Sequence, residues 1–231
     1  MVKRTATTVV FLLALSLTAF ADTLTLTGTG TNTAAGVYVV PYYLTDQSSS
    51  GSTTYTVACD SYFNTVTVGE SWTGSVNTFA TLNLTEFGNV SNSSFNAQQA
   101  YTEAGWIYDQ FLASPTAANA AATNFAIWSL FIAAYKTPLN ASEYANFLSG
   151  FNAAAQAMVN AALAWWNSAT LAQKAQIQAG LLIFTPSNVT NDGSGPQEYI
   201  TMMVPEPASL LVFGTGLLLG FGYLRRKPSV C

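Results

Sequence analysis

Hydrophobic segments with basic residues beside them occupy both ends of this 231-residue chain, so the stretch between them must form the folded domain. At the N-terminus, Lys3-Arg4 precedes the apolar run Thr7–Phe20, and Ala19-Phe20-Ala21 has the small-x-small pattern of a cleavage site. This arrangement is typical of a secretory signal peptide, and the run is short for a bilayer span. We therefore predict a signal peptide over residues 1–21, cleaved after Ala21. An uncleaved N-terminal anchor is the alternative.

The C-terminal apolar segment, Ala208–Leu224, contains no charged residue and is seventeen residues long. That length lies at the lower end of what a helix needs to cross a hydrocarbon core. The cluster Arg225-Arg226-Lys227 follows it, and basic residues next to a span favour the cytoplasmic side. The two ends together predict a protein exported across the inner membrane, with a domain of residues 22–203 outside and a single C-terminal transmembrane helix over 208–224.

Charge is segregated along the chain. All 11 acidic residues lie between Asp22 and Glu206, where Lys136 and Lys174 are the only basic ones, so this part carries a formal charge of about −9 (2 basic minus 11 acidic). Nucleic acid and anionic membranes are bound through basic patches, and this balance argues against both. Cys59 lies in the exported part and Cys231 lies beyond the basic cluster, so we expect no bridge between them. A buried apolar thiol and a reactive thiol both remain open for Cys59.

The hydrophobic period changes near Asn96 and divides the exported part into two halves. Before Asn96, apolar residues alternate with polar ones, which is typical of half-buried strands. We predict strands at Leu24–Gly30, Gly36–Leu44, Thr54–Cys59, Phe63–Val68 and Thr78–Leu84, with a turn at Ser48–Ser52.

After Asn96, apolar residues recur at helical spacing. We predict helices from a capping box at Asn96 and Gln99 to Ser114-Pro115, over about Ala117–Lys136, from about Asn140 to Trp166, and from a capping box at Thr170 and Gln173 to Gly180. Leu181–Thr185 and Gln197–Val204 are predicted to be closing strands. The expected fold class is α+β, with an N-terminal antiparallel β region, a helical insert and closing strands.

The residue types exclude much of the usual chemistry. Histidine is absent, which removes Ser-His-Asp and Cys-His catalysis and most transition-metal sites. Nucleotide-binding glycine motifs and acidic calcium loops are also missing from the sequence, so we expect no cofactor and no metal. Carboxylate pairs, Asp60 with Glu70 or Glu103 with Asp109, are the remaining candidates for acid–base chemistry on carbohydrates. Their spacing selects no catalytic arrangement, and we expect that the protein is not an enzyme.

The C-terminal segment resembles the PEP-CTERM sorting signal of Gram-negative bacteria. Val204-Pro205-Glu206-Pro207, a glycine-rich apolar helix and Arg225-Arg226-Lys227 follow one another in the order and spacing of that signal. The resemblance implies recognition by an exosortase-type membrane enzyme that processes the chain near Pro205–Pro207. It implies that the domain is anchored in the membrane until processed and then sent to the cell surface or secreted.

A second resemblance concerns the domain itself. Val57-Ala58-Cys59-Asp60 at a strand end and Phe125-Ala126-Ile127-Trp128 on a helix are similar to segments of the thioester domains of bacterial surface adhesins. Those domains join a Cys to a Gln shortly before the A-I-W segment, and the thioester captures amines. Here Asn124 stands in place of the Gln, and asparagine is one methylene shorter. The resemblance implies a thioester between Cys59 and Asn124, or the relic of one.

The sequence therefore predicts an exported, surface-sorted structural or interaction protein of the bacterial envelope or extracellular matrix. A covalent adhesin using Cys59 is the alternative, and a carbohydrate-active enzyme is the remaining one. The expected partners are the processing enzyme and extracellular polysaccharide or other surface proteins.

Overall fold

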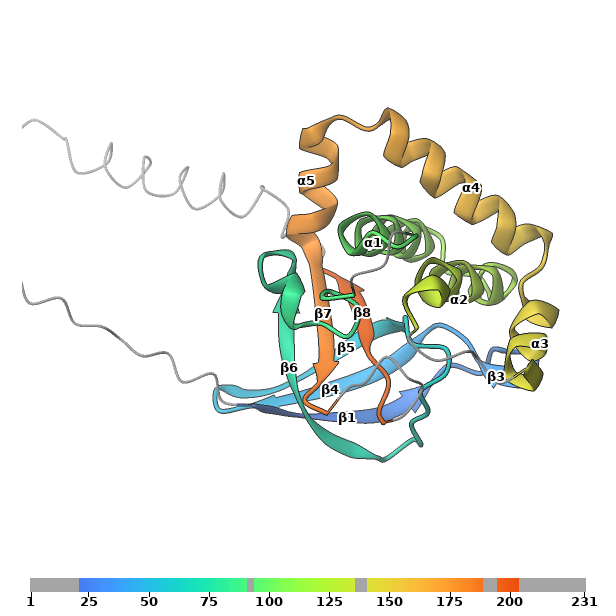
Figure 1. Ribbon diagram of the computed structural model, residues 1–231. Coiled ribbons are helices and arrows are strands. Elements are labelled where there is room, and N and C mark those ends of the chain that lie inside the picture. The colour runs from blue at the N-terminus through green and yellow to red at the C-terminus, as the bar shows by residue number, and fades with distance from the viewer. Residues whose placement is uncertain (1–20, 91–93, 136–140, 189–194, 204–231) are drawn as a thin grey trace, which may run out of the picture.

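The computed structural model describes residues 21–90, 94–135, 141–188 and 195–203. Six strands form a closed antiparallel barrel in the order β1-β4-β5-β8-β7-β6, and the helices pack together on one side of it (Figure 1). The barrel strands are β1 (Asp22–Thr29), β4 (Tyr42–Ser48), β5 (Gly51–Cys59), β6 (Ser71–Thr78), β7 (Leu181–Pro186) and β8 (Tyr199–Met202), and β2 (Thr33–Ala34) pairs with β3 (Val37–Tyr38) in a separate ribbon. The antiparallel N-terminal region and the mixture of strands and helices are confirmed. Closure of the strands into a barrel was not predicted.

The barrel closes at a seam between segments far apart in the sequence. β4 and β5 form a hairpin around Ser49-Ser50, as the serine-rich turn predicts. β8 then inserts between β5 and β7, and only two residue pairs, Ala58 with Ile200 and Cys59 with Tyr199, join it to β5. The backbone N–H of Asp60 extends this seam by donating to the carbonyl of Glu198 at 3.3 Å. The end of β5 is therefore the place where the two halves of the sheet meet.

Close packing inside the barrel explains one of its glycines. Leu24 and Leu26 of β1 are buried on the inner face, as their alternation predicts. Gly74 of β6 lies next to Leu24, and a Cβ atom at this position would come within 2.4 Å of the leucine Cδ1 atom. A larger residue at position 74 would therefore displace the core side chain.

Several strand predictions in the N-terminal half are wrong. Residues 63–68 form no strand, and 79–84 form the 3-10 helix η1 (Phe79–Leu84) in place of the end of a strand. The strand β6, Ser71–Thr78, was missed. The predicted strand at Gly36–Leu44 is divided at Pro41, which follows a cis peptide bond and lies between β3 and β4. Threonine and valine favour extended backbone throughout this region, so composition alone does not locate the strands that pair.

The helical half contains α1 (Ala97–Ala113), α2 (Ala117–Phe131), the short 3-10 turn η2 (Ile132–Ala134), α3 (Ala141–Gly150), α4 (Ala153–Ser168) and α5 (Leu171–Gly180). The predicted capping box of Thr170 and Gln173 at the start of α5 is confirmed. At α1 only half of the predicted box is present: Asn96 Oδ1 accepts from the backbone N–H of Gln99, whereas the Gln99 side chain donates to Glu103. The predicted single helix from Asn140 to Trp166 is wrong. It is two helices, because the Asn152 side chain accepts from the N–H groups of Ala154 and Ala155 and so starts α4.

The helices bury aromatic side chains against one another. Phe131 of α2 packs edge-on against Tyr101 of α1, with ring centroids 4.9 Å apart, and Trp106 of α1 stacks on Trp165 of α4 at 5.6 Å. The run Ala117–Ala134 is long and apolar enough to cross a membrane, but it belongs to this core, where Ile127 and Phe131 are completely buried. The predicted transmembrane helix 208–224 lies outside the described residues, as does the signal peptide up to residue 20.

Candidate functional site

The two residues of the thioester resemblance, Cys59 and Asn124, lie together in the core. Cys59 is the last residue of β5 at the barrel seam, and Asn124 lies in the middle of α2, 65 positions later. The Asn124 Nδ2 atom donates to the Cys59 carbonyl at 2.9 Å, and the Asn124 Oδ1 atom accepts from the N–H of Val40 at 2.9 Å. All three residues are fully buried. The asparagine thus joins α2 to the end of β5 and to the segment before β4 through main-chain groups.

The thiol of Cys59 is held as a neutral, enclosed group. Its Sγ atom donates to the carbonyl of Ser61 at 3.3 Å, and no part of the residue is exposed. Burial raises the pKa of Cys59, and the nearby Asp60 raises this pKa further. Because the thiolate is the nucleophilic form, these surroundings disfavour reactivity at neutral pH.

A buried chain of hydrogen bonds continues from this thiol toward β7. Ser61 Oγ donates to Glu86 Oε2, and the backbone N–H of Glu86 donates to Glu198 Oε2 at 2.8 Å. The hydroxyl of Thr185 donates to the same Glu198 oxygen at 2.6 Å, and the hydroxyl of Tyr101 donates to its Oε1 atom. Glu198 therefore collects donors from α1, β7 and the segment after η1. We call Cys59, Asp60, Ser61, Glu86, Tyr101, Asn124, Thr185 and Glu198 the seam network.

Three carboxyl groups share this interior. Asp60 and Glu198 are completely buried and Glu86 is 7% exposed. Burial raises the pKa of Asp60, and the neighbouring charges of Glu198 and Glu86 raise it further. Burial also raises the pKa of Glu198, but hydrogen bonds from Glu86, Thr185 and Tyr101 act in the opposite direction. The carboxyl oxygens of Asp60 have no hydrogen-bond partner among the described residues, so Asp60 is the group whose charged form is most disfavoured, and Glu198 is the better stabilised carboxylate.

No basic side chain of the described residues neutralises this cluster. The one described lysine, Lys174, lies 4.0 Å above the ring of Trp166 on the helical side. The part of the chain that the structure describes also holds no group of His, Cys, Asp and Glu side chains arranged to bind a metal ion. Protonation and hydrogen bonding are thus the means by which the cluster is tolerated in the core.

The carboxylate pairs suggested by the sequence are not brought together. Glu70 is exposed and accepts from the N–H of Thr67 at 2.9 Å, whereas Asp60 is buried beside Glu198. Glu103 is buried on α1, while Asp109 of the same helix is exposed. Sequence reasoning missed Glu86 and Glu198. The signal for Glu198 was its place at the edge of an apolar strand, where an unpaired charge would be unfavourable unless it had a structural or chemical role.

A cavity of about 460 Å³ adjoins the thiol side of the network. Its lining includes Tyr38, Tyr62 and Gln197 together with Tyr42 and Trp128. Trp128 and Tyr42 are close enough to Cys59 for an electrostatic influence between each of them and the thiol. Cys59 itself does not line the cavity.

The sorting residues lie mostly outside the described part of the chain. Ala21 is exposed immediately before β1, which starts at Asp22, the predicted first residue after cleavage. Ala19 lies outside the described residues, as do the predicted sorting residues Val204, Pro205, Glu206 and Pro207 and the cluster Arg225, Arg226 and Lys227.

Residues 204–227 match the family model of the PEP-CTERM protein-sorting motif. The match spans both the V-P-E-P sequence and the basic cluster, and the predicted sorting signal is thereby confirmed. No curated protein and no solved structure matches the chain. The likeness of the domain to adhesin thioester domains stays a prediction.

Proposed function

Because the chain carries a PEP-CTERM sorting motif, which marks an exported protein with a membrane-anchored precursor that an exosortase processes, we propose that it is a structural or interaction protein of the bacterial envelope or extracellular matrix. The motif is the observation that carries this proposal. The proposed role is non-catalytic and relies on binding by the domain of residues 22–203.

The folded domain supports a binding role over a catalytic one. Its three clustered carboxyl groups are enclosed in the core, where a substrate does not reach them. Its network instead joins the barrel seam to α1 and α2, because Glu198, Tyr101 and Asn124 bond across those elements. Hydrogen bonds between these elements stabilise the domain, and a stable domain suits a binding role outside the cell.

The sorting signal can be tested with a tag placed in the Ser49-Ser50 turn of the full chain. We expect the wild-type domain at the cell surface or in the medium and shortened at its C-terminus. Replacing Pro205, Glu206 and Pro207 together with alanine should leave an unprocessed precursor in the membrane. The control replaces Ser209, just beyond the V-P-E-P sequence in the apolar segment, with alanine and should sort normally. Equal sorting of the triple variant and the wild type would contradict the proposal.

A covalent adhesin is the second candidate, and the meeting of Cys59 with Asn124 favours it. In such a protein the Cys59 sulfur attacks the carboxamide carbon of Asn124, a C–S bond forms, the C–N bond breaks, and the thiol proton leaves with the nitrogen as ammonia. The resulting thioester would then acylate an amine on a partner surface. The oxygen and the nitrogen of the Asn124 carboxamide are both hydrogen-bonded to main-chain groups, which favours a free thiol and an intact carboxamide over the thioester.

Intact mass separates the two candidates. A covalent adhesin lacks the mass of one ammonia, and Cys59→Ala restores that mass. For the processed domain we expect no mass deficit. Its one thiol, that of Cys59, should react with a thiol reagent only after the domain is unfolded. Asn124→Gln is an informative companion, because it adds the methylene that the resembling domains possess.

A further inference from the structure

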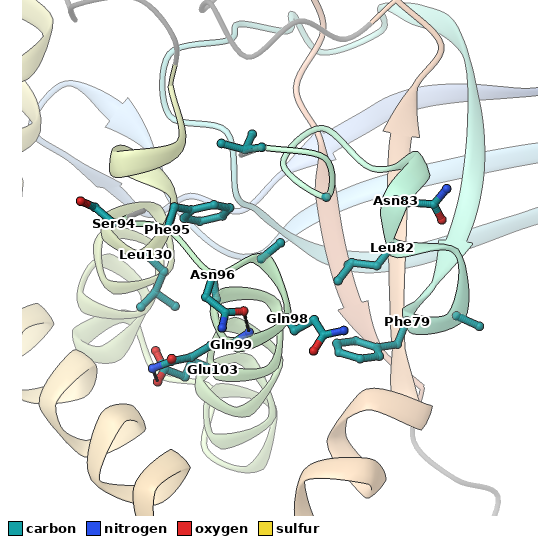
Figure 2. A pocket seen from close by; sticks show the side chains of 15 residues that line it. Phe79, Leu82, Asn83, Ser94, Phe95, Asn96, Gln98, Gln99, Glu103 and Leu130 are labelled. Atoms are coloured by element: carbon teal, nitrogen blue, oxygen red, sulfur yellow. Dashed lines mark hydrogen bonds between the residues drawn. The ribbon is translucent and has the colours of Figure 1, made fainter. Parts of the chain in front are cut away.

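A second, open pocket of about 820 Å³ lies between η1 and the first turns of α1 (Figure 2). Its walls are formed by η1, by residues just after it, by the segment that leads into α1 with the first turns of that helix, and by Leu130 of α2. This volume is within the range of small-molecule and oligomer-segment sites. None of the seam network residues lines it.

Amide side chains dominate the polar part of the lining. Asn83 and Gln98 are exposed, and Gln99 is half-buried with its Nε2 atom donating to Glu103 at 2.8 Å. Each carboxamide offers donors and acceptors from one group, so such a lining suits a ligand that carries many hydroxyls. Among the described residues that line the pocket there is no lysine or arginine, which disfavours an anionic ligand.

Glu103 supplies an acceptor that is built into the wall. The residue is 4% exposed although it lines the pocket, and its one described hydrogen bond comes from Gln99. A carboxylate oriented by an amide neighbour can accept from adjacent hydroxyl groups of a sugar ring. Glu103 is the only acid among the described lining residues, whereas glycoside hydrolysis uses a pair of carboxyl groups.

Two phenyl rings complete the lining. Phe79 and Phe95 are half-buried, so each keeps part of its ring accessible. Figure 2 shows Phe79 from η1 and Gln98 from α1 extending toward one another. Aromatic faces next to hydrogen-bonding groups match the two sides of a sugar ring, one of C–H groups and one edged by hydroxyls.

We propose that this pocket binds a segment of a neutral, hydroxyl-rich polysaccharide and does not cleave it. The inference rests on the proposed function in one respect, because the domain meets such polymers only after export. It names the ligand class of the binding role. An apolar ligand is disfavoured by the amides and Glu103, and a uronic-acid polymer is disfavoured by the carboxylate and the missing cations.

The test uses the full chain, purified in a detergent without a sugar headgroup, and titrated by calorimetry with neutral oligosaccharides built from glucose, galactose or mannose. An oligomer of uronic acid is the charged comparison. We expect saturable binding of at least one neutral oligomer that changes little with salt. Gln98→Ala and Phe79→Ala should each weaken it about three- to tenfold, and Gln110→Ala, an exposed amide of α1 outside the pocket, should not.

The inference is overturned by three results: no binding of any neutral oligomer at millimolar concentration, tighter binding of the uronic-acid oligomer, or equal binding by Gln98→Ala and wild type. Gln98 is exposed, so its variant stays informative if Phe79→Ala fails to fold. Protease treatment of intact cells distinguishes a failure of glycan binding from a failure of the proposed function, because only a domain exposed at the cell surface is digested. A domain that is accessible on cells but binds no glycan refutes the pocket alone.

Discussion

The seam network and the amide-lined pocket both place glutamate side chains in the folded domain, yet they differ in access. Glu198 accepts hydrogen bonds from three other buried residues, Glu86, Tyr101 and Thr185, and its side chain is closed to solvent. Glu103 has one described hydrogen bond and lines a pocket of about 820 Å³. Acidic residues in this chain therefore divide by their surroundings into those whose hydrogen bonds join elements of the core and one, Glu103, that is buried in the wall of a pocket. The predictions below test this division through stability, beginning with the largest expected effect.

Glu198→Ala should be the most damaging change. It removes the acceptor of the Glu86 N–H, the Thr185 hydroxyl and the Tyr101 hydroxyl, all in the core. We expect a loss of about 3–5 kcal/mol in the free energy of unfolding, measured by urea denaturation of the full chain. Asp109→Ala, an exposed acid on α1, is the control and should change it by less than about 0.5 kcal/mol. Similar effects of the two substitutions would contradict a structural role for the network.

Asn124→Ala should follow in size. The substitution removes the acceptor of the Val40 N–H and a donor to the Cys59 carbonyl, and it leaves a small void beside the barrel. We expect a loss of about 2–4 kcal/mol by the same measurement. Asn160→Ala on α4 is the matched control. It removes an exposed asparagine whose Oδ1 atom accepts a hydrogen bond from the Gln156 side chain. An unchanged midpoint for Asn124→Ala would show that the asparagine does not tie α2 to the barrel.

The pH dependence of stability tests the protonated state of Asp60. The pKa values of Asp60 and Glu198 are raised in the folded protein, and so is that of Glu103. A raised carboxyl pKa gives stability that is complete below the unfolded value, near 4, and lost as the pH rises through the folded value. The free energy of unfolding should therefore fall between pH 4 and pH 8, and Asp60→Asn should reduce this slope. Stability that rises over this window would contradict the account.

Gln98→Ala should have the smallest effect on stability. Its side chain is exposed at the pocket, so we expect a change within about 0.5 kcal/mol in the unfolding free energy. Circular dichroism during thermal unfolding checks this expectation. A large loss of unfolding free energy would show that Gln98 stabilises the fold. It would contradict the distinction between the seam network and the amide-lined pocket.

The features that the sequence predicted depend on local pattern. The caps at Asn96 and at Thr170 with Gln173 need only a side chain and the next turn of backbone, and the hairpin around Ser49-Ser50 needs only a short polar turn. The sorting motif is likewise a contiguous sequence. These elements can be located from neighbouring residues alone.

The features that it missed depend on residues distant in the chain. Barrel closure needs β8 to enter beside β5, and Glu86 meets Glu198 across 112 positions. Neither contact leaves a periodic signal. The strand error at Phe63–Val68 has the same origin, because extended propensity does not say which segment finds a partner. The meeting of Cys59 with Asn124 is the exception, since a resemblance to another family drew attention to both.

The intact mass of the domain recovered from the cell surface tests the central claim most directly. The account predicts a chain that starts at Asp22, ends near the V-P-E-P sequence, and retains the full mass of a free thiol and an asparagine carboxamide. A mass of the unprocessed chain would contradict sorting through the motif. A mass short by one ammonia, and restored by Cys59→Ala, would contradict the noncovalent binding role and establish the covalent one.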